Sequence, residues 1–135
     1  MTKKRKVLIA GASGLVGYGA VKHFGERDDW EAIAVSRRPP LDRHGADFIS
    51  VDLMDQTRCR EVFGAMGDVT HVVYAALFEK ISTGLLRGWR ERDQMETNLA
   101  MLRNLFEPLS AVARDLRRMD RTTNARRKRW TGQLE

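Results

Sequence analysis

A short apolar run that leads directly into three evenly spaced glycines constrains the fold of this chain more than any other feature. Residues 7–10 are Val-Leu-Ile-Ala, and Gly11, Gly14 and Gly17 follow in a G-x-x-G-x-x-G pattern. A continuous apolar run of this length is typical of a parallel strand covered on both faces. Residues 15–25 then carry apolar side chains at helical spacing, in a stripe formed by Leu15, Val16, Ala20, Val21 and Phe24. A strand, a glycine turn and a helix in this order predict a dinucleotide site.

In such a site, glycine is required at each of the three positions for a different physical reason. Gly11 permits a tight turn with backbone dihedrals that a side chain would oppose. Gly14 leaves room for a pyrophosphate, and Gly17 lets the helix pack closely against the strand. The helix N-terminus offers free N–H groups to phosphate oxygens. We therefore expect cofactor contacts at Gly11, Ser13, Gly14, Leu15, Val16 and Gly17. A glycine turn without a ligand is the alternative.

The rest of the chain alternates strand and helix patterns. The apolar runs predict strands at 32–35, 48–51 and 71–76, a helix over 56–66 after the N-cap residue Asp55, and a long helix from about 89 or 93 to 113, interrupted by Pro108. Alternation of this kind indicates βαβ units around a parallel sheet. With right-handed crossovers, we expect an α/β, Rossmann-type doubly wound sheet of about four strands in the order 3-2-1-4.

The end of the second predicted strand indicates which dinucleotide binds. An enzyme that uses NAD places an acidic residue there to hold the ribose 2′-hydroxyl. This chain has Ser36, Arg37 and Arg38 instead. Two guanidiniums and a hydroxyl attract a 2′-phosphate, and one charge-assisted hydrogen bond of about 1.5–3 kcal/mol favours NADP by roughly 10- to 100-fold. The sequence therefore favours NADP(H), with a surface arginine pair that binds nothing as the alternative.

Two further strand ends fit the same cofactor. Asp52 and Leu53 end the third strand, where they can meet the adenine. Ala75 and Ala76 end the fourth strand beside the glycine turn, and their small size leaves room for a ribose. Packing at strand ends would explain all four residues equally well.

With these residues placed, the chain resembles the extended short-chain dehydrogenase/reductases of the NAD-dependent epimerase/dehydratase superfamily. It is most similar to their progesterone 5β-reductase and iridoid synthase-like branch. The segments that carry the resemblance are GASGLVG (11–17), VSRRPP (35–40), FISVDLMD (48–55), HVVYAALFE (71–79) and ERDQMETNLAMLRNLFEPL (91–109). The resemblance implies NADPH-dependent enone or carbonyl reduction in the full-length family, and covers only the N-terminal part of such an enzyme.

The resemblance ends near residue 116. The family continues with a fifth strand, a Tyr and a Lys that assist hydride transfer, and a substrate region, whereas residues 117–130 here are rich in arginine. Eight of the 24 Lys and Arg residues lie in the last 22 positions. We therefore expect a cofactor domain over 1–116, truncated before the catalytic half. Over 117–135 we expect a disordered or non-native basic tail, such as a frameshift near codons 116–118 would produce.

The sequence offers no catalytic or metal-binding machinery of its own. Tyr18 and Lys22 have the Tyr-x-x-x-Lys spacing, but they lie on the glycine-turn helix, so we interpret the match as coincidence. The histidines lie on separate predicted elements without metal-ligand spacing. Cys59 is the only cysteine, which fits a reducing cytoplasm. The chain has no apolar run long enough to cross a membrane.

Two functions remain open at this point. The first is an NADP(H)-binding fragment of a reductase without turnover. The second is a non-enzymatic dinucleotide-binding or regulatory module whose basic tail contacts nucleic acid or a partner subunit, although a nucleic-acid partner is the less favoured expectation. The fourth strand is apolar and lacks a Lys or Pro that would protect it as a sheet edge, so we expect self-association through it.

Overall fold

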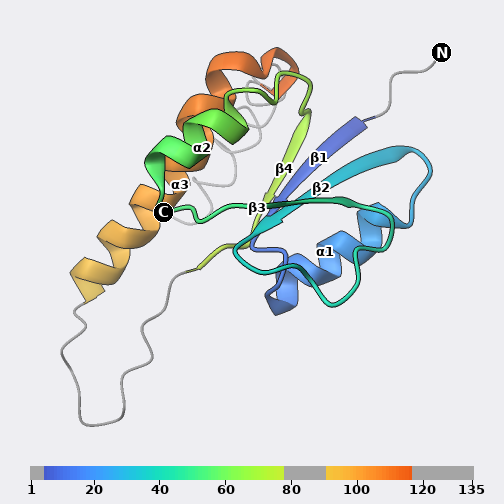
Figure 1. Ribbon diagram of the computed structural model, residues 1–135, viewed down its shortest axis with the longest axis horizontal. Coiled ribbons are helices and arrows are strands. Elements are labelled where there is room, and N and C mark those ends of the chain that lie inside the picture. Colours follow the sequence, from blue (N-terminus) through green and yellow to red (C-terminus); the bar gives the residue numbers. More distant parts are fainter. Residues whose placement is uncertain (1–4, 78–90, 117–135) are drawn as a thin grey trace, which may run out of the picture.

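The computed structural model describes residues 5–77 and 91–116, which form a single α/β unit (Figure 1). Its elements, in chain order, are β1 (Arg5–Ala10), α1 (Leu15–Gly25), β2 (Trp30–Ser36), β3 (Asp47–Ser50), α2 (Gln56–Phe63), β4 (His71–Tyr74) and α3 (Glu91–Val112). The predicted basic tail lies outside the described residues.

The four strands form one parallel sheet in the order β3-β2-β1-β4. The predicted Rossmann-type fold and strand order are therefore confirmed. β1 is central, because Ala10 pairs with Val35 of β2 on one side and with Tyr74 of β4 on the other. The chain moves outward from β1 to β3 and then crosses back to β4. This reversal opens a crevice at the carboxyl ends of the strands, beside β1.

The two faces of the sheet are covered by different helices. α1 covers one face, while α2 and α3 lie side by side on the other (Figure 1). The buried core on the α1 face consists of Ile9 together with alanines and valines, namely Val7, Ala12, Val21, Ala32, Ala34 and Ala46. The opposite face holds bulkier residues, among them Leu8, Phe63, Met66, Leu105 and Leu109. Because residues of a strand alternate between faces, β1 contributes to both cores.

Two predicted elements extend further along the chain than the observed ones. The helix predicted over 56–66 ends at Phe63, where the N–H of Gly64 bonds to the carbonyl of Arg60 and a turn follows. The strand predicted to reach Ala76 ends at Tyr74. Its partner β1 turns away at Gly11, and the pairing closes with the bond from the N–H of Ala75 to the carbonyl of Ala10.

The predicted apolar stripe of α1 was wrong at its first two positions. Leu15 and Val16 are 93% and 71% exposed, whereas Val21 is fully buried. The first turn of α1 projects past the end of the sheet, so none of the four described strands lies beneath it (Figure 1). The expected interruption of the last helix was also wrong, since α3 continues through Pro108. Proline removes one helical hydrogen bond there. The burial of Leu105 and Leu109 on either side offsets this loss.

Candidate functional site

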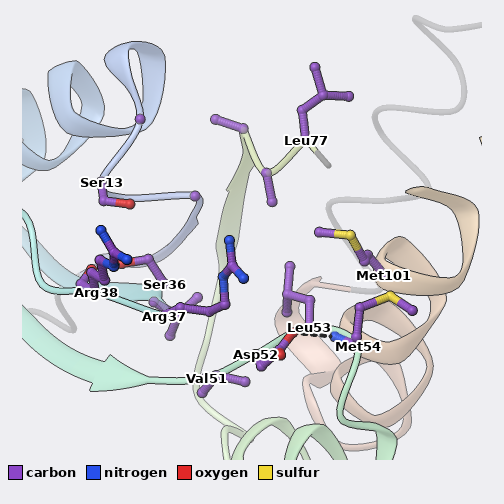
Figure 2. A pocket seen from close by; sticks show the side chains of 15 residues that line it. Ser13, Ser36, Arg37, Arg38, Val51, Asp52, Leu53, Met54, Leu77 and Met101 are labelled. Carbon is purple, nitrogen blue, oxygen red and sulfur yellow. Dashed lines mark hydrogen bonds between the residues drawn. The ribbon is translucent and has the colours of Figure 1, made fainter. Parts of the chain in front are cut away.

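A cavity of about 570 Å³ lies at the carboxyl ends of the strands (Figure 2). This volume is within the range of small-molecule sites, and the position is the one where open α/β sheets bind ligands. Two walls face each other across it. The glycine wall is formed by Gly11, Ser13, Gly14, Ser36, Arg37 and Arg38. The methionine wall is formed by Val51, Asp52, Leu53, Met54 and Met101.

The glycine turn has the geometry that its sequence predicts. Gly11 has φ +80°, a conformation that L side chains rarely adopt. A Cβ at Gly11 would also lie 2.6 Å from the backbone of Ala75 and Ala76, so the turn rests directly on the end of β4. A Cβ at Gly17 would overlap the carbonyl oxygen of Gly11, so α1 packs against the turn itself. A Cβ at Gly14 meets only the Gly11 oxygen at 3.5 Å, which is an ordinary contact.

The arginine pair lies where β2 ends, on the same side of the cavity as Ser13 (Figure 2). Arg37 and Arg38 are exposed, and within the described part of the chain neither guanidinium has an ion-pair partner. The Ser36 hydroxyl donates a hydrogen bond to the carbonyl of Arg38, and Ser50 donates to the carbonyl of Arg37 at 3.0 Å. These two bonds fix the backbone that carries both guanidiniums and leave the guanidiniums themselves available to an anion.

The loop after β3 forms the base of the methionine wall. The Asp52 side chain accepts a hydrogen bond from the N–H of Met54 at 2.9 Å, and its carbonyl accepts one from Asp55 at 2.9 Å. Asp55 then caps α2 by accepting from the N–H of Arg58. Cys59 is buried beneath this loop, with Sγ 3.7 Å from the Asp52 carbonyl. Burial, together with the Asp55 and Asp52 charges, raises the pKa of Cys59 to about 11.

Most of the predicted contact residues meet in this one cavity. Gly11, Ser13, Gly14, Ser36, Arg37, Arg38, Asp52, Leu53, Ala75 and Ala76 all line it, whereas Leu15, Val16 and Gly17 do not. The side chains of Leu15 and Val16 are exposed instead. Sequence reasoning missed Val35, Val51, Met54, Leu77 and Met101. The first four adjoin predicted residues at strand ends, but nothing in the local sequence marks Met101, which comes from α3.

Neither tyrosine with catalytic potential faces the cavity. The Tyr18 hydroxyl is 3.0 Å from Nε2 of His44, whose Nδ1 is 3.2 Å from Glu26. Tyr18 therefore attaches α1 to the connection between β2 and β3. Tyr74 packs in the core beside Phe106, and among the described residues its buried hydroxyl has no partner. Burial, with a smaller effect of Cys59, raises the pKa of Tyr74.

The described residues contain neither a metal-binding cluster nor a membrane-spanning helix. No group of three or more His, Cys, Asp or Glu side chains there is arranged to hold a metal ion. No helix in the described ranges, 5–77 and 91–116, has the length and apolar character needed to span a membrane.

Known proteins of similar sequence match most of this chain. A 3-oxo-Delta(4,5)-steroid 5-beta-reductase of Arabidopsis thaliana is 30% identical over 117 residues, which are 82% of this chain and 28% of the relative. A (S)-8-oxocitronellyl enol synthase, ISY1, of Nepeta cataria is 28% identical over 135 residues, covering 95% of this chain and 32% of the relative. The chain thus spans about a third of the length of the curated relatives it matches.

Solved structures agree on the fold. A short chain dehydrogenase family protein from Francisella tularensis superposes with a TM-score of 0.66 at 13% identity, covering 82% of this chain and 47% of that one. An NADPH bound carbonyl reductase from chicken fatty liver gives 0.60 at 14% identity, covering 83% and 49%. The family model described as "NAD dependent epimerase/dehydratase family" matches residues 7–120. Together with the glycine turn and the 3-2-1-4 sheet, this match shows that the chain belongs to the NAD dependent epimerase/dehydratase family.

Proposed function

We propose that this chain binds NADP(H) and is the cofactor-binding part of an NADPH-dependent reductase. The observation that carries the proposal is the position of Arg37 and Arg38 in the same cavity as the glycine turn, without a carboxylate partner among the described residues. A dinucleotide phosphate has two anionic groups, and the glycine wall offers a separate cationic or N–H-rich surface for each of them.

The geometry supports one orientation of the cofactor. The pyrophosphate lies over Gly11 and Gly14, where the free N–H groups of the first turn of α1 and the helix dipole favour an anion. The 2′-phosphate lies against Arg37 and Arg38 at the end of β2. The adenine then lies against the methionine wall, and the nicotinamide half extends past Ala75 and Ala76 at the end of β4. Leu15, Val16 and Gly17 contribute to this arrangement through the backbone of the helix N-terminus.

The arginine pair makes NADP(H) the preferred cofactor. Each guanidinium presents N–H groups in a fork that fits two phosphate oxygens. Both side chains are exposed, so solvent weakens the attraction, and one net contact of about 1.5–3 kcal/mol gives roughly 10- to 100-fold. The reductase activity in the name of the Arabidopsis relative and the NADPH in the chicken carbonyl reductase support the same choice.

Titration calorimetry with NADPH and NADH tests the cofactor preference. We expect NADPH to bind at least tenfold more tightly, and the double variant Arg37→Ala, Arg38→Ala to remove most of the difference. Arg27→Ala is the matched control, because Arg27 is an exposed arginine that pairs with Asp29 outside the cavity. Equal affinities for both cofactors in the unmodified protein would refute the NADP(H) assignment.

We further propose that this chain binds the cofactor without turnover. The described residues that line the cavity include no Tyr, Lys or His that could donate a proton during reduction of an enone. The Tyr18 hydroxyl is bonded to His44, and Tyr18 does not line the cavity. An assay of NADPH consumption with progesterone or a small α,β-unsaturated ketone is expected to show none. Consumption that depends on the enone and is lost in Tyr18→Phe would contradict this proposal.

A further inference from the structure

A hydrogen bond from α3 reaches the loop that forms the base of the methionine wall. Nδ2 of Asn104 donates to the carbonyl oxygen of Leu53 at 2.7 Å, between residues 51 positions apart in the chain. Leu53 is 7% exposed and lines the cavity. A buried carbonyl that loses its donor costs more than an exposed one, since water cannot replace the bond. Asn104 is itself half-buried and does not line the cavity.

The other hydrogen bonds that the described residues form with this loop do not connect it to α3. The Asp52 carboxylate accepts from Met54, and the Asp52 carbonyl accepts from Asp55, so both bonds lie within the loop. The Cys59 thiol adds a weak contact from α2 at 3.7 Å. Among the described residues, the bond from Asn104 is therefore the hydrogen bond that fixes the distance between this loop and α3.

The same helix also supplies the opposite part of the wall. Met101 lies three positions before Asn104 on α3, and its side chain lines the cavity near Met54 (Figure 2). Residues three apart on a helix lie on neighbouring positions of one face. α3 thus contributes an apolar contact surface at Met101 and, one turn later, the donor that holds Leu53 at a fixed position relative to that surface.

We propose that Asn104 is a positioning residue for the adenine half of the dinucleotide. It acts through Leu53. The bond to Leu53 holds the loop of Asp52, Leu53 and Met54 at the distance from Met101 that the flat adenine ring requires. This inference rests on the proposed function, because it assumes that a dinucleotide fills the cavity. Residue 104 then affects affinity from outside the cavity, without touching the ligand.

The inference predicts a pattern of ligand affinities that differs from that of the arginine pair. Loss of Asn104 weakens every ligand that carries the adenosine half, so NADP+, NAD+ and 2′,5′-ADP lose affinity by the same factor. The preference for NADP+ over NAD+ stays unchanged, because Arg37 and Arg38 are not altered. The Arg37→Ala, Arg38→Ala variant does the opposite, since it removes the preference and affects NAD+ least.

Two substitutions and one control test the inference. Asn104→Leu keeps the branching at Cγ, with a larger side chain, and removes the donor, and Asn104→Asp keeps the shape and replaces the donor with an acceptor. Thr70→Val is the matched control, because it also removes side-chain hydrogen bonds to backbone, at 2.9 and 3.0 Å to Lys6, but at the amino end of the sheet. We expect both Asn104 variants to bind NADP+ and 2′,5′-ADP roughly three- to tenfold more weakly than the unmodified protein, and Thr70→Val to bind normally.

Hydrogen exchange gives a readout that does not depend on the ligand. We expect the amides of Met54 and Asp55, which donate within the loop, to exchange faster in both Asn104 variants, while amides of β1 stay protected. The inference is overturned if the unmodified protein binds NADP+ and both Asn104 variants bind it within twofold, or no more weakly than Thr70→Val. It is also overturned if the preference for NADP+ falls with the affinity. If the unmodified protein binds neither NADP+ nor 2′,5′-ADP, the proposed function fails first, and this inference with it.

Discussion

The glycine wall and the methionine wall enclose one cavity but are built in different ways. The glycine wall comes from two short segments at the ends of the sheet's central strands: 11–14, which directly follows β1, and 36–38, which begins with the last residue of β2. The methionine wall joins the loop after β3 to a helix that begins about 40 residues later, and Asn104 links the two. One wall therefore depends on local backbone geometry, and the other on the packing of α3 against α2 and the sheet.

This difference also separates the chemistry of the two walls. Anion recognition needs free N–H groups and guanidiniums, which a strand–turn–helix unit and a strand end provide with few long-range contacts. A flat apolar surface needs side chains held at a fixed spacing, and that depends on the close packing of a core. Substitutions in the glycine wall should therefore change the stability of the fold or the charge that faces the ligand. Substitutions around the methionine wall should change the positions of the side chains that contact the ligand.

The largest expected effect separates a structural glycine from a ligand-facing one. Gly17→Ala places a Cβ on the carbonyl of Gly11, where only backbone can move, so we expect a loss of about 3 kcal/mol of unfolding free energy or more. Gly14→Ala adds a Cβ in ordinary contact, at an N-cap position with φ −82°, so we expect a loss below about 1 kcal/mol. Urea denaturation measures both values.

The binding of NADP+ by Gly14→Ala completes this comparison. Its Cβ points into space that the fold leaves open, so a folded variant with weakened binding indicates that the cofactor occupies that space. The proposed role of Gly14 would be wrong if the variant were stable and bound NADP+ as well as the unmodified protein does. All three glycines of the pattern, Gly11, Gly14 and Gly17, would then be required for folding and not for binding the cofactor.

A smaller effect is expected from pH, through the buried thiol beneath the methionine wall. Cys59 has a pKa of about 11 in the folded protein, against an ordinary value of 9.0. The raised pKa means that its contribution to stability is fully present below pH 9 and is lost as the pH rises toward 11. We expect the unfolding free energy to fall over this interval. Burial raises the pKa of Tyr74 in the same direction.

Cys59→Ala isolates the part that the thiol contributes. The variant is less stable at pH 7 because it leaves a small cavity in the core, but its stability should decline less between pH 9 and 11 than that of the unmodified protein. Parallel declines would show that the thiol does not control this pH dependence.

The smallest effect expected is weak association through β4. β4 is one edge of the four described strands, and its residues are half-buried and apolar apart from His71 and the buried hydroxyl of Tyr74. Burial, with a smaller effect of Arg5, lowers the pKa of His71, so near neutral pH this residue adds little charge to oppose pairing. An apolar edge of this kind pairs with other chains. Analytical ultracentrifugation over a range of concentrations should therefore detect dimers or larger species, and a single monomeric species at high concentration would contradict the prediction.

The sequence predicted the elements whose signals are local. The run at 7–10, the turn at Gly11 and the strand around Ala34 are all present, and the alternation of strands and helices gave the order β3-β2-β1-β4. The errors occurred where a neighbouring element determines the burial of a side chain or the end of a strand. Leu15 and Val16 have helical spacing but lie beyond the end of the described strands and are exposed, and β4 ends at Tyr74 because β1 turns away.

By itself, the sequence determined the glycine wall. Glycines at fixed spacing after an apolar strand, and arginines at the end of the next strand, act through backbone geometry and charge that depend on nearby residues. Only the tertiary structure determined which residues form the methionine wall. Met101 and Asn104 look like ordinary positions of an amphipathic helix, and no local signal shows which of them faces the cavity and which holds Leu53. Their roles follow from the docking of α3 beside α2, and that docking depends on how the side chains of the whole core fit together.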